Sequence, residues 1–228
     1  MSRDRKYSIQ LVVEGNEEEY FFKIVEAKGL SGKISLSVKN AGGFGNIASY
    51  YQSYISNDEI DAVFAVYDVD YRQNEEDSPF RTVRKQLLEI LGYENSVNAA
   101  SLCTNPNILQ LFLLAKDTLD KVALKQTSKK YNTKFVRKYW PEIGKEKTNC
   151  NGLDNTNYYD AKIWQLEIIK TDILNVPYQN LLNNLDCLPT EYICNNPGGN
   201  LKPFLIALKD GDIEFFKNLS KKIRTFDE

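Results

Sequence analysis

The sequence predicts an α/β fold in which helices flank a parallel sheet, followed by a mainly helical C-terminal part. Three observations support this prediction. Short apolar runs rich in β-branched residues alternate with segments of helical periodicity. Two of these runs are followed by acidic residues, and in parallel sheets the residues at the carboxyl ends of strands often form binding sites. Beyond about residue 121 the composition shifts toward Lys, Tyr and Asn.

The first β-α unit is the clearest. Residues 9–13 (IQLVV) form a continuous apolar run, which is typical of a strand buried on both faces of a parallel sheet. Gly15 ends it, and a helix is expected from Glu17 to about Gly29, with acidic residues in its first turn. One face of this helix is apolar and should meet the core; it carries Tyr20, Phe21, Ile24 and Val25.

Further strands and helices follow the same alternation. Strands are expected at residues 34–38, 61–66 and 99–103, and helices at 47–55, at 80–91, from residue 105, within 161–174 and as a pair within 204–223. The glycine-rich segment 41–45 (AGGFG) could cradle a phosphate with its backbone N–H groups. It lacks the Lys-Ser or Lys-Thr of a P-loop and the spacing of a dinucleotide fingerprint, so a flexible connection is the favoured interpretation.

The composition excludes several kinds of chemistry. The 228 residues are 42% hydrophobic and 26% charged, which is ordinary for a globular protein. The chain has no histidine, and its four cysteines form no CxxC pair, so zinc sites and Ser-His-Asp or Cys-His triads are not expected. Catalysis would have to use carboxylates, lysine, tyrosine or a metal ion.

The sequence predicts a cytoplasmic protein without a membrane association. No apolar run approaches the roughly 18 to 20 residues that a spanning helix needs. The first ten residues, MSRDRKYSIQ, lack the apolar stretch of a signal peptide.

Acidic side chains follow two of the expected strands. Glu14 comes directly after residues 9–13, and Asp68 and Asp70 come after residues 61–66. The carboxyl ends of parallel strands lie at one edge of the sheet, so these three carboxylates are expected to meet in one crevice. Asp68 and Asp70 are two residues apart in extended chain and can approach one metal ion together. Three oxygen ligands suit Mg²⁺ or Mn²⁺, although an isolated Asp-x-Asp is more often a solvated turn.

Both acidic segments resemble the signature of the Toprim superfamily, in which a glutamate ends the first strand and an Asp-x-Asp pair ends a later one. The matching residues are Glu14-Gly15-Asn16-Glu17-Glu18 and, 54 residues after Glu14, Asp68-Val69-Asp70. Within this superfamily, residues 14–21 (EGNEEEYF) and 104–114 (TNPNILQLFLL) look most similar to small RloB-like and OLD-type nucleases of prokaryotic phage defence. The resemblance covers about residues 5–115 and implies a Rossmannoid sheet of Toprim type.

This resemblance implies Mg²⁺- or Mn²⁺-dependent cleavage of phosphodiester bonds in RNA or DNA. A metal ion held by Asp68 and Asp70 would polarise the phosphoryl oxygen and lower the pKa of an attacking water. Glu14 would be a ligand of this metal, a ligand of a second one, or the general base. Glu18 would support a ligand or a bound water, although acids in a first helical turn are more often favoured simply by the helix dipole.

Two departures from the closer family pattern motivate an alternative. Leu109 stands where the similar nucleases usually have glutamate, and Ala115 stands where they usually have histidine. A non-catalytic binding or regulatory module that acts with a partner protein would tolerate both changes. An enzyme acting on nucleotides or small phosphate compounds is a third reading of the same acidic residues.

A basic segment with interleaved aromatic residues is the candidate nucleic-acid contact. Residues 121–147 hold nine Lys or Arg against two Glu, while the whole chain has a net charge of −2. If residues 129–140 are helical, basic and aromatic side chains occupy neighbouring faces. The basic side chains could contact phosphates and the aromatic ones could stack on bases or pack in a core. The candidate contacts are Lys129, Lys130, Lys134, Arg137 and Lys138.

The sequence suggests two regions. Residues 1–120 are expected to form a Toprim-like metal-binding α/β domain. Residues 121–228 are expected to form a mainly helical region, either separate or built as an insertion plus closing helices of the same domain. Nucleic acid is the expected partner. The resemblance adds a defence-system protein such as an ATPase, and a homodimer is compatible with the sequence.

Overall fold

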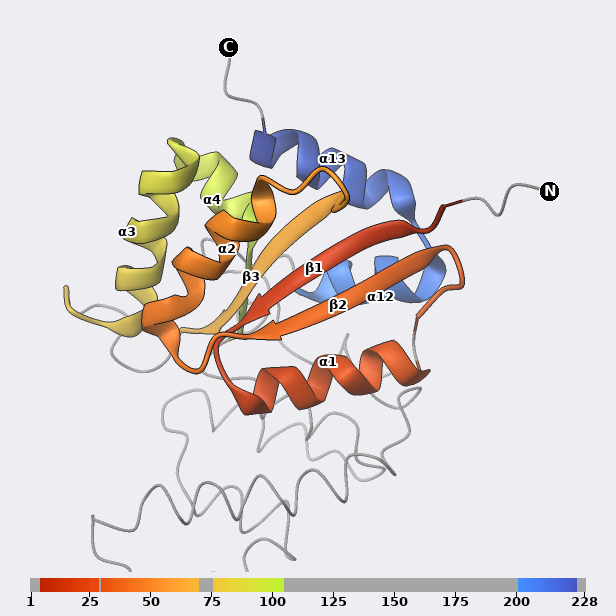
Figure 1. The fold of residues 1–228 in the computed structure, drawn as a ribbon, viewed down its shortest axis with the longest axis horizontal. Coiled ribbons are helices and arrows are strands. Elements are labelled where there is room, and N and C mark those ends of the chain that lie inside the picture. Colours follow the sequence, from red (N-terminus) through yellow and green to blue (C-terminus); the bar gives the residue numbers. More distant parts are fainter. Residues whose placement is uncertain (1–4, 29, 70–75, 105–200, 225–228) are drawn as a thin grey trace, which may run out of the picture.

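Four parallel strands form the centre of the molecule in the order β2-β1-β3-β4 (Figure 1). The computed structural model describes residues 5–28, 30–69, 76–104 and 201–224. The strands are β1 (Tyr7–Val13), β2 (Ile34–Asn40), β3 (Ala62–Asp68) and β4 (Ser101–Thr104). The predicted α/β fold with a parallel sheet flanked by helices is therefore confirmed.

Strand β1 occupies an inner position and pairs with a neighbour on each side. Val13, its last residue, pairs with Asn40 of β2 and with Val66 of β3. The central residues of β1 and β3 are buried on both faces of the sheet, which explains why both segments read as unbroken apolar runs. The register brings the carboxyl ends of three strands to one edge.

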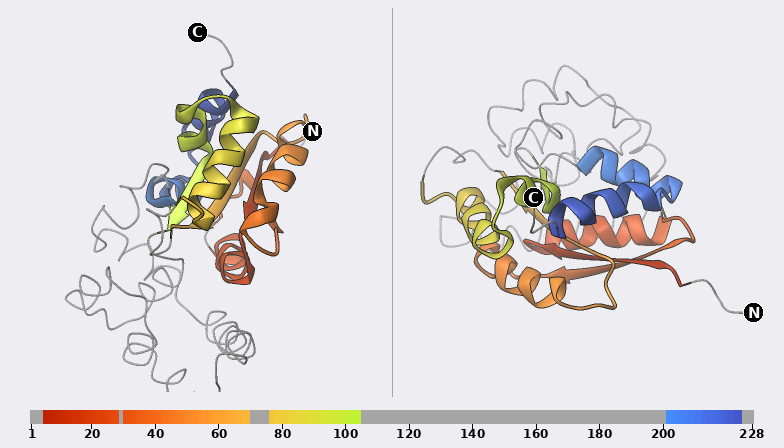
Figure 2. Two further views of the ribbon diagram at one scale, coloured as in Figure 1. Left: turned by 90° about the vertical axis from the view of Figure 1, so that its left-hand side faces the viewer. Right: turned by 90° about the horizontal axis from the view of Figure 1, so that it is seen from above.

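Helices cover both faces of the sheet, as the two views of Figure 2 show. Helices α1, α12 and α13 lie on one face and α2 and α3 on the other, while α4 packs against α3 and α13. The bounds are α1 (Asn16–Lys28), the 3-10 helix η1 (Phe44–Asn46), α2 (Ile47–Ile55), α3 (Pro79–Leu91), α4 (Glu94–Ala100), α12 (Leu201–Asp210) and α13 (Ile213–Arg224). Across these described ranges, every helix is too short or too polar to cross a membrane.

The limits of α3 follow from its sequence. The Ser78 hydroxyl accepts a hydrogen bond of 3.3 Å from the backbone N–H of Arg81, which satisfies one of the free donors of the first turn. Pro79 occupies the first helical position, where no backbone hydrogen bond is lost. Gly92 ends the helix with φ 78°, a left-handed conformation that favours glycine.

A group of four phenylalanines joins the two C-terminal helices to the sheet. The Phe204 ring of α12 lies 5.1 Å from Phe64 of β3, 6.4 Å from Phe22 of α1 and 5.3 Å from Phe216 of α13, measured between ring centres. All four rings are buried and meet edge to face, an arrangement that adds to the gain from burial. Residues 201–224 therefore share one hydrophobic core with residues 5–104.

Hydrogen bonds hold α13 along the amino-terminal end of β3 and along α4. The Ser220 hydroxyl donates to the carbonyl oxygen of Asp61 at 2.9 Å. The Ser96 hydroxyl of α4 donates to the carbonyl oxygen of Lys222 at the same distance. These contacts and the aromatic group make α12 and α13 the closing elements of the α/β core, while the expected boundary near residue 120 lies outside the described residues.

Three details differ from the sequence prediction. Residues 94–100 form helix α4, which was not predicted, so the strand expected at 99–103 starts later, at Ser101. Phe22 was not placed on the buried face of α1, yet its side chain is fully buried because α12 covers this helix from the side. The helices expected from residue 105 and within 161–174 lie outside the described residues.

Truncation of Phe204 should destabilise the whole α/β core. Phe204→Ala removes a fully buried ring and is expected to lower the free energy of unfolding by about 3 to 5 kcal/mol. Ile206→Ala, on the same helix, removes a side chain that is 40% exposed and should change it by less than about 1 kcal/mol. Urea unfolding followed by circular dichroism measures both. Equal effects of the two variants would contradict the packing of α12 on the sheet.

Candidate functional site

The candidate site lies where the chain leaves β1 and β3. From β1 the chain crosses to β2 at one edge of the sheet, whereas β3 and β4 extend the sheet in the other direction. In open α/β sheets, ligands bind outside the carboxyl ends of the strands at such a point of reversal. Glu14 directly follows β1 and Asp68 is the last residue of β3, so both carboxylates belong to this point.

Glu14 is held by contacts from two neighbouring segments. Its backbone N–H donates to the carbonyl oxygen of Val66 at 2.9 Å, which extends the pairing of β1 with β3. Its side-chain Oε2 accepts a hydrogen bond of 3.2 Å from the backbone N–H of Asp68. Its carbonyl oxygen accepts a hydrogen bond of 2.8 Å from Gly43, in the loop after β2. The carboxylate is therefore fixed beside the end of β3.

Glu18 has a structural task at the start of α1. It is the third residue of the helix, and its carboxylate accepts a hydrogen bond of 2.8 Å from the backbone N–H of Gly15, the residue before the helix. A glutamate at this position satisfies a free donor in the way of a capping box. Glu18 is only 3% exposed. The Glu18 side chain therefore contacts the turn that carries Glu14, through the backbone of Gly15.

Asn40, at the end of β2, links the turn after β1 to the loop after β2. Its side-chain amide donates to Asn16 at 2.7 Å and to Glu19 at 2.9 Å, and its side-chain oxygen accepts from the Gly42 N–H at 2.8 Å. Burial alone would raise the pKa of the Glu19 carboxyl. The hydrogen bonds from Lys23 and Asn40 outweigh burial and hold this pKa below its ordinary value. Glu19 is therefore a charged member of the network at neutral pH.

On the other side of β3, a buried polar group supports the strand end that carries Asp68. The Tyr67 hydroxyl donates to the Ser101 hydroxyl of β4 at 2.8 Å and also contacts the Cys103 thiol. Burial raises the pKa of Tyr67 well above its ordinary value and raises the pKa of Cys103 to about 12. Both groups are therefore neutral at physiological pH and act as parts of the core.

The predicted site residues are only partly brought together. Glu14 and Asp68 are neighbours at the reversal point, joined by the hydrogen bond from the Asp68 backbone N–H to the Glu14 carboxylate. Glu18 lies close to Glu14 in sequence, but its carboxylate is directed to the backbone of Gly15. Several predicted residues lie outside the described ranges: Asp70, Leu109, Ala115, Lys129, Lys130, Lys134, Arg137 and Lys138.

The oxygen donors at this point fit a hard divalent cation. Glu14 supplies a carboxylate next to the backbone of Asp68, and carboxylate oxygens are the type of ligand that Mg²⁺ and Mn²⁺ prefer. Asp70, the third expected ligand, follows Asp68 by two residues. In ranges 5–28, 30–69, 76–104 and 201–224, no three His, Cys, Asp or Glu residues are grouped as a metal site. The three-carboxylate set predicted from the sequence includes Asp70, which lies outside the described residues.

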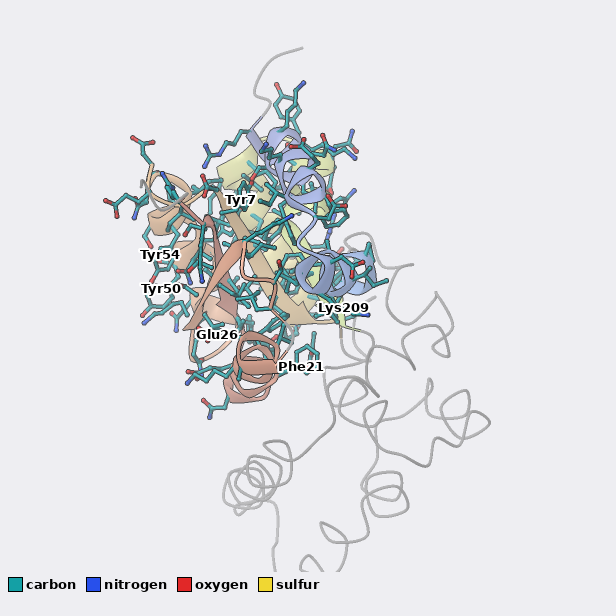
Figure 3. The ribbon with its side chains drawn as sticks, turned by 90° about the vertical axis from the view of Figure 1, so that its right-hand side faces the viewer. Tyr7, Phe21, Glu26, Tyr50, Tyr54 and Lys209 are labelled. Atoms are coloured by element: carbon teal, nitrogen blue, oxygen red, sulfur yellow. The ribbon has the colours of Figure 1, made fainter. Side chains whose placement is uncertain are left out.

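Two parts of this site were not foreseen from the sequence. The glycine-rich loop was expected to be a flexible connection, yet it is tied to Glu14 through Gly43 and contains η1. Asn40 was not singled out, although an asparagine that ends a strand before two glycines is a recognisable turn signal. At the same end of β2, the Lys39 ammonium lies 4.4 Å from the centre of the Tyr50 ring. Figure 3 shows Tyr50 and Tyr54 of α2 on one side of the sheet and Lys209 of α12 on the other.

Comparisons of this chain with models of protein families, with curated proteins and with solved structures find no match.

Loss of the Glu18 carboxylate should weaken the start of α1. Glu18→Ala leaves the Gly15 N–H without this acceptor, so we expect the free energy of unfolding to fall by about 0.5 to 2 kcal/mol. Glu18→Gln keeps a side-chain oxygen that can accept from the same N–H and should retain most of this stability. Urea unfolding of both variants tests the capping role. A loss in Glu18→Gln as large as in Glu18→Ala would contradict it.

The Cys103 thiol should make stability depend on alkaline pH. Its pKa is about 12 in the folded protein and ordinarily 9.0, so its contribution is fully present below pH 9 and is lost as the pH rises toward 12. Between pH 8 and pH 10 this loss is about 1.4 kcal/mol. Cys103→Ala removes the thiol and with it this pH-dependent loss, so the variant should lose less stability between pH 8 and pH 10. Urea unfolding at each pH measures the difference, and parallel pH profiles would contradict it.

Proposed function

We propose that this protein is a Mg²⁺-dependent nuclease of Toprim type, which hydrolyses phosphodiester bonds in RNA or DNA. The observation that carries the proposal is the meeting of Glu14 and Asp68 at the reversal point, where Glu14 Oε2 lies 3.2 Å from the Asp68 nitrogen. Two acidic residues at the ends of neighbouring strands, at the edge where α/β proteins bind ligands, are a suitable start for a phosphate-directed metal site.

The protein's own residues have separable tasks in this proposal. Mg²⁺ bound by Glu14, Asp68 and Asp70 would polarise a phosphoryl oxygen and lower the pKa of an attacking water. The Asp68 N–H orients the Glu14 carboxylate. Glu18 caps α1 beside the turn that carries Glu14, so its support of a ligand would act through this turn. Because these groups are already in position, the site needs little rearrangement when the phosphate binds.

Substrate binding in this proposal also uses the basic segment of the sequence. Its members Lys129, Lys130, Lys134, Arg137 and Lys138 would neutralise backbone phosphates. The prokaryotic antiphage setting, with a partner protein such as an ATPase, comes from the resemblance of the two acidic segments to RloB-like and OLD-type nucleases.

A binding or regulatory module is the second candidate. One oxygen of Glu14 already accepts a hydrogen bond from the backbone of Asp68, so this carboxylate has a structural task that a non-catalytic protein would also keep. The residues Leu109 and Ala115, which depart from the similar nucleases, point in the same direction. Such a module would act through a partner protein.

Conservative removal of either charge should abolish cleavage without unfolding the protein. Glu14→Gln keeps an oxygen that can accept from Asp68, and Asp68→Asn keeps the size of the side chain. We expect each variant to cleave labelled RNA and DNA at least about 100-fold more slowly than the wild type with Mg²⁺ or Mn²⁺. EDTA should stop cleavage by the wild type.

Glu26→Gln is the matched control, because Glu26 is an exposed carboxylate of α1 (Figure 3). It should cleave at the wild-type rate. Undiminished cleavage by Glu14→Gln or Asp68→Asn would refute the nuclease proposal. A wild-type protein that neither cleaves nor binds Mg²⁺ in calorimetry would favour the binding module.

A further inference from the structure

The loop between β2 and α2 is fastened to the candidate site. We call residues 41–46 the glycine loop. The Ala41 N–H donates to the carbonyl oxygen of Val13 at 2.9 Å, and the Gly43 N–H donates to that of Glu14 at 2.8 Å. Inside the loop, the Asn46 side chain donates to the carbonyl oxygen of Ala41 at 3.0 Å. The residue that follows Gly43 is therefore placed by the same contacts that place Glu14.

That residue, Phe44, is the first residue of η1, which packs against α3, and it is partly exposed. Its side chain is 37% exposed, and two other large hydrophobic residues in the described ranges are also exposed, Tyr93 at 54% and Ile206 at 40%. Tyr93 lies between α3 and α4, and Ile206 belongs to α12. A single exposed hydrophobic residue needs no functional explanation by itself. Phe44 differs from the others because it lies one residue from a backbone contact with Glu14.

The residues on both sides of Phe44 are glycines and bring no side chains of their own. Gly43 has φ 131°, a conformation that side chains rarely adopt, so the backbone explains this glycine. Gly45 has no such φ, and a Cβ atom added there would meet no atom within 4 Å. Neither strain nor crowding in the fold requires glycine at position 45. A bare backbone here lets a flat group come close to the Phe44 ring.

We propose that Phe44 stacks on an unpaired base of the nucleic acid whose phosphate lies at Glu14 and Asp68. This inference rests on the proposed function for its class of substrate, and it adds that the strand at the site is single or locally unpaired. In a duplex the faces of the bases are covered by their neighbours, whereas in a single strand each face can stack on an aromatic ring. Lys39, held against Tyr50 in the first turn of α2, supplies a positive charge at the base of the same loop.

Equilibrium binding with Mg²⁺ to strands with cleavage-resistant phosphorothioate linkages tests the stacking contact apart from cleavage, because a metal ion is needed to bring a phosphate to the two carboxylates. Fluorescence anisotropy would give Kd values for a labelled single strand of about 15 nucleotides and for the matching duplex. We expect Phe44→Ala to weaken single-strand binding about 5- to 100-fold and to change duplex binding much less. Phe44→Tyr keeps an aromatic ring and should bind like the wild type. Tyr93→Ala, which removes another exposed aromatic side chain of the described ranges, is the matched control and should leave both Kd values unchanged.

A spectroscopic readout reports stacking directly. The emission of 2-aminopurine falls when the base stacks, so scanning it along the single strand should reveal a position that is quenched by the wild type and Phe44→Tyr but not by Phe44→Ala. Wild-type affinity in Phe44→Ala, an equal loss in Tyr93→Ala, or a wild type that binds no single strand would overturn the inference. Cleavage with Mg²⁺ is scored separately, so an inactive protein that still shows the Phe44-dependent binding refutes the nuclease proposal and leaves stacking in place.

Discussion

The parallel pairing of β1 with β2 on one side and with β3 on the other is the constraint on which the rest of the structure depends. Parallel crossovers are almost always right-handed, so a chain that moves first one way and then the other along the sheet places its helices on opposite faces. The same reversal makes the segments after β1 and β3 diverge. Glu14 and Asp68 stand at this divergence because of strand order, before any side-chain contact is considered.

The strands and most helices of the described ranges could be predicted from the sequence, because local hydrophobic patterns determine them. Residues 9–13 and 61–66 consist almost wholly of apolar residues, which only a strand covered on both faces can bury. Helix α4 was not accessible in this way, since its sequence ENSVNAA is short and has little periodicity. Its contacts with α13, including the hydrogen bond from Ser96 to Lys222, come from a segment more than one hundred residues away. Local patterns carry no information about such a partner.

The candidate site also contains some features that could be predicted from the sequence and others that could not. The proximity of Glu14 and Asp68 could be predicted, because strand ends in a parallel sheet share an edge. The direction of the Glu18 carboxylate could not be predicted with equal ease, since the residue before the helix is Gly15, whereas a capping box usually begins with Ser or Thr. The bonds of Asn40 depend on the turn geometry of two separate loops. Side-chain orientation at a site is thus decided by backbone details that periodicity does not encode.

The aromatic group around Phe204 has a consequence for synthesis of the protein. Phe64 and Phe204 touch although 140 residues separate them in the sequence. A nascent chain that has emerged as far as residue 104 contains all four strands and α1, but not the helices that cover Phe22 and Phe64. Contacts over such distances form slowly, and an uncovered apolar face invites aggregation while it lasts. The α/β core therefore has its full cover only after the chain has been extended through α13.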